Sequence, residues 1–207
     1  MRVFGVDFTS APRLRKPITC LEAFLSGDRL TARRLYIFTD FVQFEAFLQV
    51  SGPWVAGLDF PFGQPGKLIT NLGWPTSWSE YVAHVAGIGQ AEFEQVIKDY
   101  RDARPAGDKH HKRYTDRLAR SISPMMLAGV PVGKMFFQGA PRLLASGLSI
   151  PPCRPTADNR IALEAYPALV ARKFIQSRSY KNDQKHKQTA EQAIARRDLV
   201  EGLLSSQ

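Results

Sequence analysis

The hydrophobic and polar positions near the start of the chain predict a buried strand that ends in a carboxylate. Residues 2–8 form a short apolar run with Asp7 near its end. The pattern returns at residues 54–60, where an apolar run ends at Asp59 and a turn containing proline and glycine follows. Short, nearly continuous apolar runs are typical of strands buried in the middle of a sheet. We therefore expect Asp7 and Asp59 to be neighbours at the same end of one sheet.

Between these two runs the pattern predicts two further strands and a helix. Residues 18–25 and 29–38 flank a Ser-Gly-Asp turn, which is typical of a β-hairpin. Asp40 can cap a helix in which phenylalanines recur at three- and four-residue spacing before the helix ends at Ser51. Residues 1–60 are therefore predicted to fold as β-β-β-α-β. The meander is expected to be antiparallel, and the helix returns the chain to a strand parallel to the first.

Residues 64–159 have a different pattern, in which helical segments are interrupted by proline and glycine. We expect a short helix after Ser77 or Ser79, a longer one over residues 90–104 and another within residues 130–148. We interpret this section as a helical insertion between the fourth and fifth strands.

A fifth strand is predicted at residues 160–167, and it carries Glu164 near its end. A helix is expected to begin at Pro167, and a last helix is expected over residues 190–204. The chain is thus predicted to form a single α/β domain over residues 1–207, with the insertion inside it.

Composition and charge narrow the class of protein. Hydrophobic residues make up 44% of the chain, which favours a globular fold over disorder. No apolar run reaches the roughly 20 residues of a membrane-spanning helix, and the start follows no signal-peptide pattern. Cys20 and Cys153 form neither a metal-binding pair nor a disulfide framework, so we expect a reduced, cytoplasmic setting. The net charge of +9 favours nucleic acid as a partner, although a solvated basic surface has the same charge.

The three strand-end acids, Asp7, Asp59 and Glu164, suggest metal chemistry. Carboxylates that converge at one sheet edge repel one another, and a hard cation such as Mg²⁺ or Mn²⁺ neutralises them. Two such ions would hold the attacking water and the leaving oxygen of a phosphodiester. The simpler interpretation is that these acids cap turns or accept backbone hydrogen bonds. Two aspartates in one predicted sheet favour the metal site, with Glu164 as a third ligand or a base that orients water.

Several segments resemble the signatures of domain-of-unknown-function family 429 (DUF429). They are Gly-Val-Asp-Phe-Thr-Ser-Ala-Pro at residues 5–12, Gly-Leu-Asp-Phe-Pro-Phe-Gly at 57–63, Glu-Ala-Tyr-Pro at 164–167 and Tyr-Lys at 180–181. The family is regarded as predicted nucleases of ribonuclease-H-like fold. The resemblance therefore implies a ribonuclease H-like mixed sheet and a metal-dependent nuclease (a hydrolase).

By this resemblance, Asp7 matches the acid of the family's first core strand, Asp59 that of the fourth and Glu164 the acid before Tyr-Pro. Thr115-Asp116 resembles a further family segment. The family pattern closes with another acidic helix that has no counterpart before Gln207, because Asp198 and Glu201 lie in a different context. Two alternatives follow: the site lacks its last ligand, or the chain is shorter than the natural protein.

Basic and hydroxyl residues supply the candidates for phosphate contacts. Arg113 and Arg117 lie in a basic stretch that starts at Lys109, and Lys181 lies in a second one. An exposed helix end explains the first stretch equally well, and adjacent histidines within it do not share a helix face for metal binding. Thr9 and Ser10 follow Asp7 directly and are expected to approach the substrate. Trp74 and Trp78 can stack on bases, but tryptophans more often fill a core.

Two other functions fit parts of this pattern. The segment after Asp7 also resembles the first phosphate loop of actin-like ATPases and sugar kinases, which would make the chain a nucleotide-binding phosphotransferase. Phe8 replaces the glycine expected there and would hinder close backbone approach. A non-catalytic nucleic-acid-binding protein is the third possibility, since the closing acidic helix is missing. It predicts salt-sensitive binding without cleavage.

Overall fold

The computed structural model describes residues 1–182 and 185–205 of the chain. The chain divides into two compact units. The first unit comprises Met1–Ser26 and Leu30–Ala165, and the second comprises Gly27–Arg29 and Tyr166–Gln207. Each unit has its own hydrophobic cluster.

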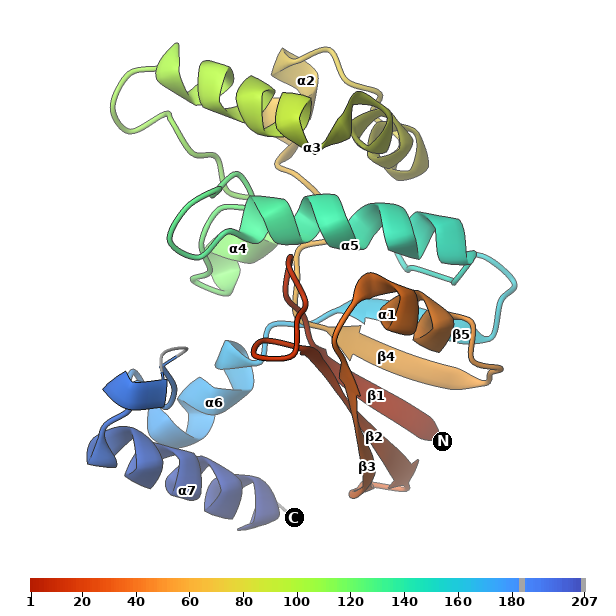
Figure 1. Cartoon of the computed structure of the whole chain (residues 1–207), viewed down its shortest axis with the longest axis vertical. Helices are drawn as coiled ribbons and strands as arrows, with labels where there is room; N and C mark the ends of the chain where they lie inside the picture. The colour runs from red at the N-terminus through yellow and green to blue at the C-terminus, as the bar shows by residue number, and fades with distance from the viewer. Residues whose placement is uncertain (183–184, 206–207) are drawn as a thin grey trace. The chain divides into compact units, whose positions relative to one another are not determined.

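A five-stranded mixed sheet forms the centre of the fold (Figure 1). Its strands are β1 (Arg2–Asp7), β2 (Ile18–Ser26), β3 (Arg29–Phe38), β4 (Trp54–Leu58) and β5 (Arg160–Glu164), in the spatial order β3-β2-β1-β4-β5. β1 is antiparallel to β2 and parallel to β4, and β4 is parallel to β5. The predictions of an α/β chain, an antiparallel start and a parallel return are therefore confirmed.

Residues of β1 and β4 alternate in burial, so one face of this part of the sheet is buried. Phe4 and Val6 of β1 and Ala56 and Leu58 of β4 are all buried. Ala162 of β5 pairs with Ala56 and is buried on the same face. Residues two apart on a strand share a face, so these positions define one helix-covered side of the sheet.

The predicted helix is present as α1 (Phe41–Leu48), and it packs on this buried face. Asp40 begins it, because the Asp40 side chain accepts a hydrogen bond from the Gln43 backbone N–H at 2.9 Å. Phe44 and Phe47 point inward, and the ring centroids of Phe47 and Phe4 lie 5.1 Å apart in an edge-to-face contact. The helix is therefore fixed to β1 by its aromatic face.

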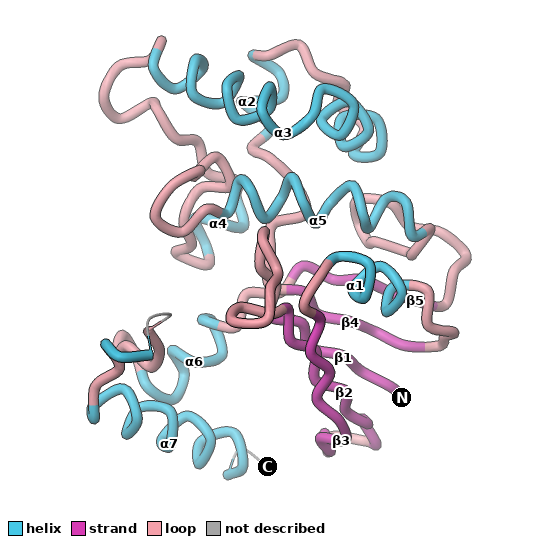
Figure 2. The backbone as a smooth tube through the Cα atoms, in the orientation of Figure 1, coloured by secondary structure: helices cyan, strands magenta, loops and turns pink. Residues whose placement is uncertain are grey.

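The section between β4 and β5 is helical, as expected. It contains α2 (Gly66–Asn71), α3 (Trp78–Asp102), α4 (Tyr114–Leu118) and α5 (Val132–Ser146). Figure 2 shows the loops that connect these helices. Helices α3 and α5 pack together through aromatic rings, with the Phe93 and Phe136 centroids 5.9 Å apart. Trp74 and Trp78 are buried in this cluster, so they fill the core.

Two glycines control the geometry of the long helices. Gly89 has a φ of 81° and a ψ of 165°, which breaks α3 close to where the sequence predicts one helix to end and the next to begin. Gly147 ends α5 in the left-handed region with a φ of 78°. Glycine reaches these angles at no steric cost, whereas other residues would be strained.

The second unit consists mainly of α6 (Ala168–Ile175) and α7 (Ala190–Ser205), with a short 3₁₀ turn, η1 (Lys185–Lys187), between them. Ala171, Ile175 and Ala195 are its buried side chains among the described residues. Arg178 forms an ion pair with Asp198 at 2.6 Å. Both helices were predicted from the sequence, whereas α2 and α4 were not.

Within residues 1–182 and 185–205, no helix combines the length and the apolar composition needed to cross a membrane. Cys20 and Cys153 are both free, the first buried and the second exposed.

Candidate functional site

Asp7 and Asp59 lie at the same end of adjacent parallel strands. Asp7 is the last residue of β1, and Asp59 follows β4 directly. Val6 pairs with Leu58, and the Asp59 backbone N–H continues the ladder by donating to the Val6 carbonyl oxygen at 2.9 Å. Neighbouring strands are about 4.8 Å apart, so the two aspartates are side by side along this edge.

Both aspartates belong to the face opposite α1. The residues that flank them, Phe8 and Phe60, are buried, and the centroids of these two rings are 4.4 Å apart. Because side chains alternate along a strand, Asp7 and Asp59 are directed to the other side. Asp7 is exposed and Asp59 is half-buried. The strand pair thus presents two carboxylates on one face.

The surface beside Asp7 is open at Gly5, whereas a Cβ atom added at Gly57 would lie 3.3 Å from Ala165 Cβ. Gly5 pairs with Gly57 on the same face, two residues before the aspartates. A Cβ atom added at Gly5 would meet no atom within 4 Å. The backbone is therefore accessible at Gly5, and a ligand held by Asp7 has room to approach the sheet there.

Glu164 lies on the opposite face from the two aspartates. It pairs with Leu58, whose side chain belongs to the helix-covered side. Glu164 Oε2 accepts hydrogen bonds from the Phe62 backbone N–H at 2.9 Å and from Arg113 Nη1 at 2.8 Å. Its Oε1 accepts from Arg113 Nη2 at 2.6 Å. Both Glu164 carboxylate oxygens therefore accept hydrogen bonds within the protein. Through these bonds Glu164 links the loop after Asp59 to the helical insertion.

Arg113 bridges Glu164 to a second carboxylate. Its Nε donates to Asp116 Oδ2 at 2.9 Å and its Nη2 donates to Asp116 Oδ1 at 2.7 Å. Ser121 and the Arg113 backbone N–H also donate to Asp116, which is only 2% exposed. The sequence singled out Arg113 for phosphate binding, but in this structure its guanidinium is bound to two carboxylates.

The electrostatics of this cluster follow from burial and pairing. Burial alone would raise the pKa of Asp116, but the hydrogen bonds and charge of Arg113 outweigh it and lower that pKa below its usual value. Burial alone would lower the pKa of Arg113, but its bonds to Asp116 and Glu164 raise it instead. Arg113 and Asp116 are therefore both charged at neutral pH.

The other predicted contacts are placed differently. Thr9 is buried and Ser10 half-buried in the loop that follows Asp7. Arg117 is exposed on α4, while Lys181 is exposed in the second unit. His111 is buried and bound to Tyr100, with 2.8 Å between His111 Nε2 and the Tyr100 hydroxyl oxygen, so it belongs to the core of the insertion. The roles proposed for Thr9, Ser10, Arg117 and Lys181 stay predictions.

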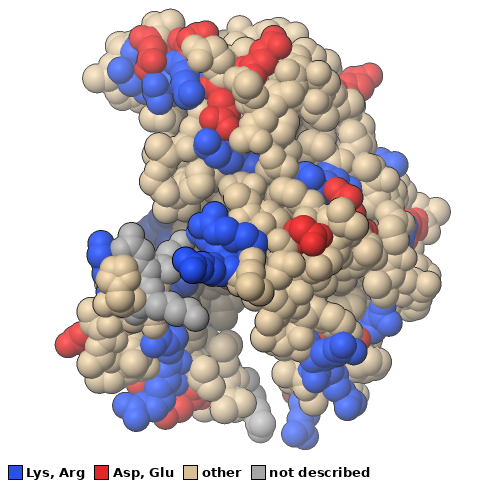
Figure 3. Space-filling view, viewed as in Figure 1, with Lys and Arg blue, Asp and Glu red and all other residues tan. Residues whose placement is uncertain are grey.

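A basic loop follows Asp7 along the chain. Arg13, Arg15 and Lys16 are all exposed between β1 and β2. Figure 3 shows basic side chains gathered over this loop. These three basic residues follow Asp7 closely in the sequence, with Thr9 and Ser10 between them. This spacing is the sequence signal that could have identified the loop as a candidate phosphate contact.

Asp7 and Asp59 are the candidate metal ligands at the sheet edge. Among the described residues, no group of three or more His, Cys, Asp and Glu side chains is placed to hold a metal ion. Mg²⁺ is often bound through one or two carboxylates and keeps several waters. Asp7 and Asp59 supply two carboxylates at this edge, and their binding of a cation stays a prediction.

Comparisons with protein-family models, with curated proteins and with solved structures found no match to this chain.

Proposed function

We propose that this chain is a Mg²⁺- or Mn²⁺-dependent nuclease of ribonuclease-H-like type that hydrolyses phosphodiester bonds of nucleic acid. The observation that carries the proposal is the neighbouring position of Asp7 and Asp59 at the carboxyl ends of adjacent parallel strands. The β-β-β-α-β order agrees with the topology that the sequence resemblance implies. The free cysteines agree with a reduced, cytoplasmic setting.

In this proposal Asp7 and Asp59 would hold the cation. When bound, the ion lowers the pKa of a coordinated water and stabilises charge on the phosphoryl oxygens. Arg13, Arg15 and Lys16 attract the flanking phosphates, because exposed cations supply most of the affinity for a nucleic-acid backbone. Thr9 and Ser10 lie between the ligand Asp7 and this loop. Because they follow Asp7 directly in the sequence, we expect them to contact the phosphate that is cleaved.

Glu164 acts in this proposal as a positioning residue. It holds the Phe62 backbone and thereby the loop that begins at Asp59. Arg113 and Asp116 keep its carboxylate in place. We expect Glu164→Gln to retain measurable cleavage, because the amide oxygen can still accept the Phe62 hydrogen bond.

The test is a cleavage assay with Mg²⁺ and with Mn²⁺ on single-stranded DNA, double-stranded DNA, RNA and a DNA–RNA hybrid. Asp7→Asn and Asp59→Asn should each lower the rate about a hundredfold or more, since they remove ligand charge worth several kcal/mol in the transition state. Glu92→Gln on the exposed surface of α3 removes one negative charge elsewhere and should leave the rate unchanged.

Cleavage that survives both aspartate changes would contradict the assigned site. If no substrate is cleaved, the nuclease proposal fails. A rise in melting temperature with ATP and Mg²⁺ would then favour the phosphotransferase alternative. If ATP and Mg²⁺ cause no such rise, salt-sensitive binding of nucleic acid would favour the non-catalytic nucleic-acid-binding alternative.

A further inference from the structure

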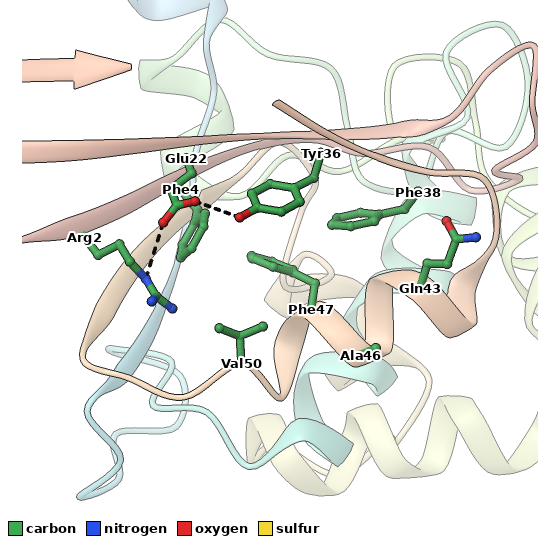
Figure 4. A pocket seen from close by; sticks show the side chains of 9 residues that line it. All are labelled: Arg2, Phe4, Glu22, Tyr36, Phe38, Gln43, Ala46, Phe47 and Val50. Carbon is green, nitrogen blue, oxygen red and sulfur yellow. Dashed lines mark hydrogen bonds and ion pairs between the residues drawn. The ribbon is translucent and has the colours of Figure 1, made fainter. Parts of the chain in front are cut away.

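Leu14 is the most exposed large hydrophobic side chain among the described residues, with 85% of its surface open to solvent. Many rings of the same unit are instead packed on one another. In the pocket beneath α1, Phe4 and Phe38 each contact Phe47, with ring centroids 5.1 and 5.6 Å apart (Figure 4). A single exposed leucine is common on protein surfaces, so its surroundings decide whether it marks a binding site. The surroundings of Leu14 are a tight turn and a group of cations.

The turn holds Leu14 in a fixed position between β1 and β2. Arg13 and Lys16 pair as an antiparallel bridge. The Arg13 backbone N–H donates to the Lys16 carbonyl oxygen at 3.1 Å, and the Lys16 N–H donates to the Arg13 carbonyl oxygen at 2.9 Å. Pro12 and Pro17 flank this pair, and proline restricts the backbone to one narrow range of φ. The turn therefore presents Leu14 at its tip without needing a partner to order it.

Three cations surround Leu14. Arg13 and Lys16 lie on opposite limbs of the turn, and Arg15 is beside Leu14 at the tip. All three are exposed. Opposite residues of an antiparallel pair have Cα atoms about 4.5–5.5 Å apart, so these long side chains extend to either side of the leucine. The turn therefore matches a surface that has negative charge on two sides and apolar groups between them.

Duplex DNA has this arrangement in its minor groove. The groove is about 6 Å wide, so the phosphates of both strands lie close to the stacked bases. Proteins that bind there often insert an apolar wedge between two base pairs while arginine and lysine contact the groove. The minor groove of duplex RNA is wide and shallow and offers a poorer match. An anionic membrane is also disfavoured, because one leucine is far less apolar surface than stable membrane binding requires.

We infer that the turn at residues 13–16 binds duplex DNA and that Leu14 inserts between base pairs from the minor groove, while Arg13, Arg15 and Lys16 contact the phosphates of both strands. The inference rests on the proposed function, since it names duplex DNA as the substrate of the site that contains Asp7. Separating two stacked base pairs costs free energy, and the cost is least at a mismatch. The turn therefore favours a mismatched duplex over a fully paired one.

The connection to Asp7 predicts where such a duplex is cut. Seven residues of chain lead from Asp7 to Leu14, and they span at most about 25 Å when fully extended. Consecutive phosphates advance about 3.4 Å along the axis, so this length corresponds to about seven base pairs. Cleavage should therefore fall within about seven base pairs of the mismatch.

The first test measures binding in EDTA, so that it does not depend on cleavage. The probes are a fully paired DNA duplex and one with a central mismatch, each carrying 2-aminopurine as a fluorescent base at the central step. We expect the wild type to bind the mismatched duplex about tenfold or more tightly and to raise its 2-aminopurine emission, which reports unstacking. Leu14→Ser should abolish that rise and bring the two Kd values within about twofold of each other.

Two variants serve as controls for this result. Leu30→Ser makes the same change at an exposed position of β3 and should leave the emission rise and the mismatch preference intact. Arg15→Gln should weaken the binding of both duplexes equally and lower the slope of log Kd against log salt by about 1, because it removes one phosphate contact. The two substitutions at the tip thus separate wedge insertion from charge.

A second test adds Mg²⁺ or Mn²⁺ and maps the cut sites on the mismatched duplex. Leu14→Ser should lose the preference for the mismatch but still cleave the paired duplex. Asp7→Asn should bind both duplexes in EDTA as tightly as the wild type. Mismatch-dependent binding without any cleavage would support the DNA-binding turn and refute the nuclease, so the two failures are distinguishable.

Three results would overturn the inference. The first is an unchanged emission rise and mismatch preference in Leu14→Ser. The second is tighter binding of duplex RNA or of single-stranded DNA than of either DNA duplex. The third is Leu14-dependent binding to vesicles of phosphatidylserine and phosphatidylcholine with no binding of DNA, which would identify a membrane as the partner of the turn.

Discussion

Arg113 connects three parts of the first unit through one side chain. It contacts Asp116 and Glu164, and Glu164 in turn holds the Phe62 backbone beside Asp59. Asp116 is almost fully buried, so its charge depends on Arg113 for compensation. The cluster explains why a basic residue near the start of α4 is kept away from solvent.

Replacing Arg113 with alanine should destabilise the fold by about 3 kcal/mol or more, because the buried Asp116 carboxylate would lose its ion-pair partner. Urea unfolding of the variant and the wild type measures this difference. Arg117→Ala, an exposed position on the same helix, should stay within about 0.5 kcal/mol of the wild type. Equal stabilities of the two variants would show that the Arg113 cluster contributes nothing.

A second network surrounds His111. Its Nε2 lies 2.8 Å from the hydroxyl oxygen of Tyr100, and its Nδ1 lies 3.6 Å from Asp108 Oδ1. Lys67 and Arg104 also bind Asp108, both at 2.7 Å. Burial lowers the pKa of His111, the charge of Lys67 lowers it further, and Asp108 opposes them only in part. His111 is therefore held in its neutral form.

We expect the free energy of unfolding to fall when the pH is lowered from 7 towards 5. Below the usual value of 6.5 the unfolded chain protonates His111, whereas the folded chain resists until the pH reaches its lower pKa. The stabilisation is thus complete above pH 6.5 and is lost on the acid side. Burial also lowers the pKa of His110, so His110 too makes the free energy of unfolding fall as the pH is lowered. Unfolding of His111→Gln should depend less on pH over this range, and an unchanged pH dependence would refute the assignment.

At the scale of elements, the contact between α5 and the end of β4 determines where Asp59 is held. Gly139 of α5 lies against the Phe60 ring, and a Cβ atom at this position would be 2.3 Å from Phe60 Cε2. Phe60 follows Asp59 directly and packs on Phe8. The close approach of the helix therefore supports both aspartates from the buried side.

Gly139→Ala should destabilise the protein by about 1–3 kcal/mol, because the methyl group would displace the Phe60 ring or the helix. The net loss is expected despite the better helix propensity of alanine. Gly87→Ala provides the matched control, since Gly87 is an exposed helical position in α3 with no atom within 4 Å of an added Cβ. It should stabilise by about 0.5–1 kcal/mol. Thermal unfolding of both variants checks the prediction, and a stabilised Gly139→Ala would contradict it.

The elements that the sequence failed to predict are short and lack local signals. Helix α2 has six residues, and its N-cap, Pro65, offers no side chain for capping. Helix α4 has five residues, and its N-cap is Arg113, whose role emerges only from its contacts with Asp116 and Glu164. Helix α1, by contrast, has the Asp40 cap and a periodic aromatic face, and its start was predicted correctly. Local patterns thus predict elements that carry their own capping and periodicity.

At the scale of the whole molecule, the two hydrophobic clusters share no described residue. The larger cluster extends no further along the chain than Ala162, and the smaller one begins with Ala171. We therefore expect a chain that ends at Ala165 to remain folded, with a cooperative thermal transition and helical and sheet signals in circular dichroism. Residues 166–207 alone should be unfolded, since so few buried side chains cannot offset the loss of chain entropy. A truncated chain without a cooperative transition would show that the first unit depends on the second.

The sequence by itself determined the strands, the main helices and the neighbouring positions of Asp7 and Asp59. Each of these follows from local alternation, from capping, or from the rule that parallel strands end at one edge. Only the tertiary structure decided which face each acid occupies, because that depends on the register between β4 and β5. It also decided that Glu164 binds Arg113, and that Arg2 and Glu22 meet in a pocket beneath α1. These contacts join residues that are 20 to 51 positions apart in the sequence. Local hydrophobic patterns do not predict contacts between residues so far apart.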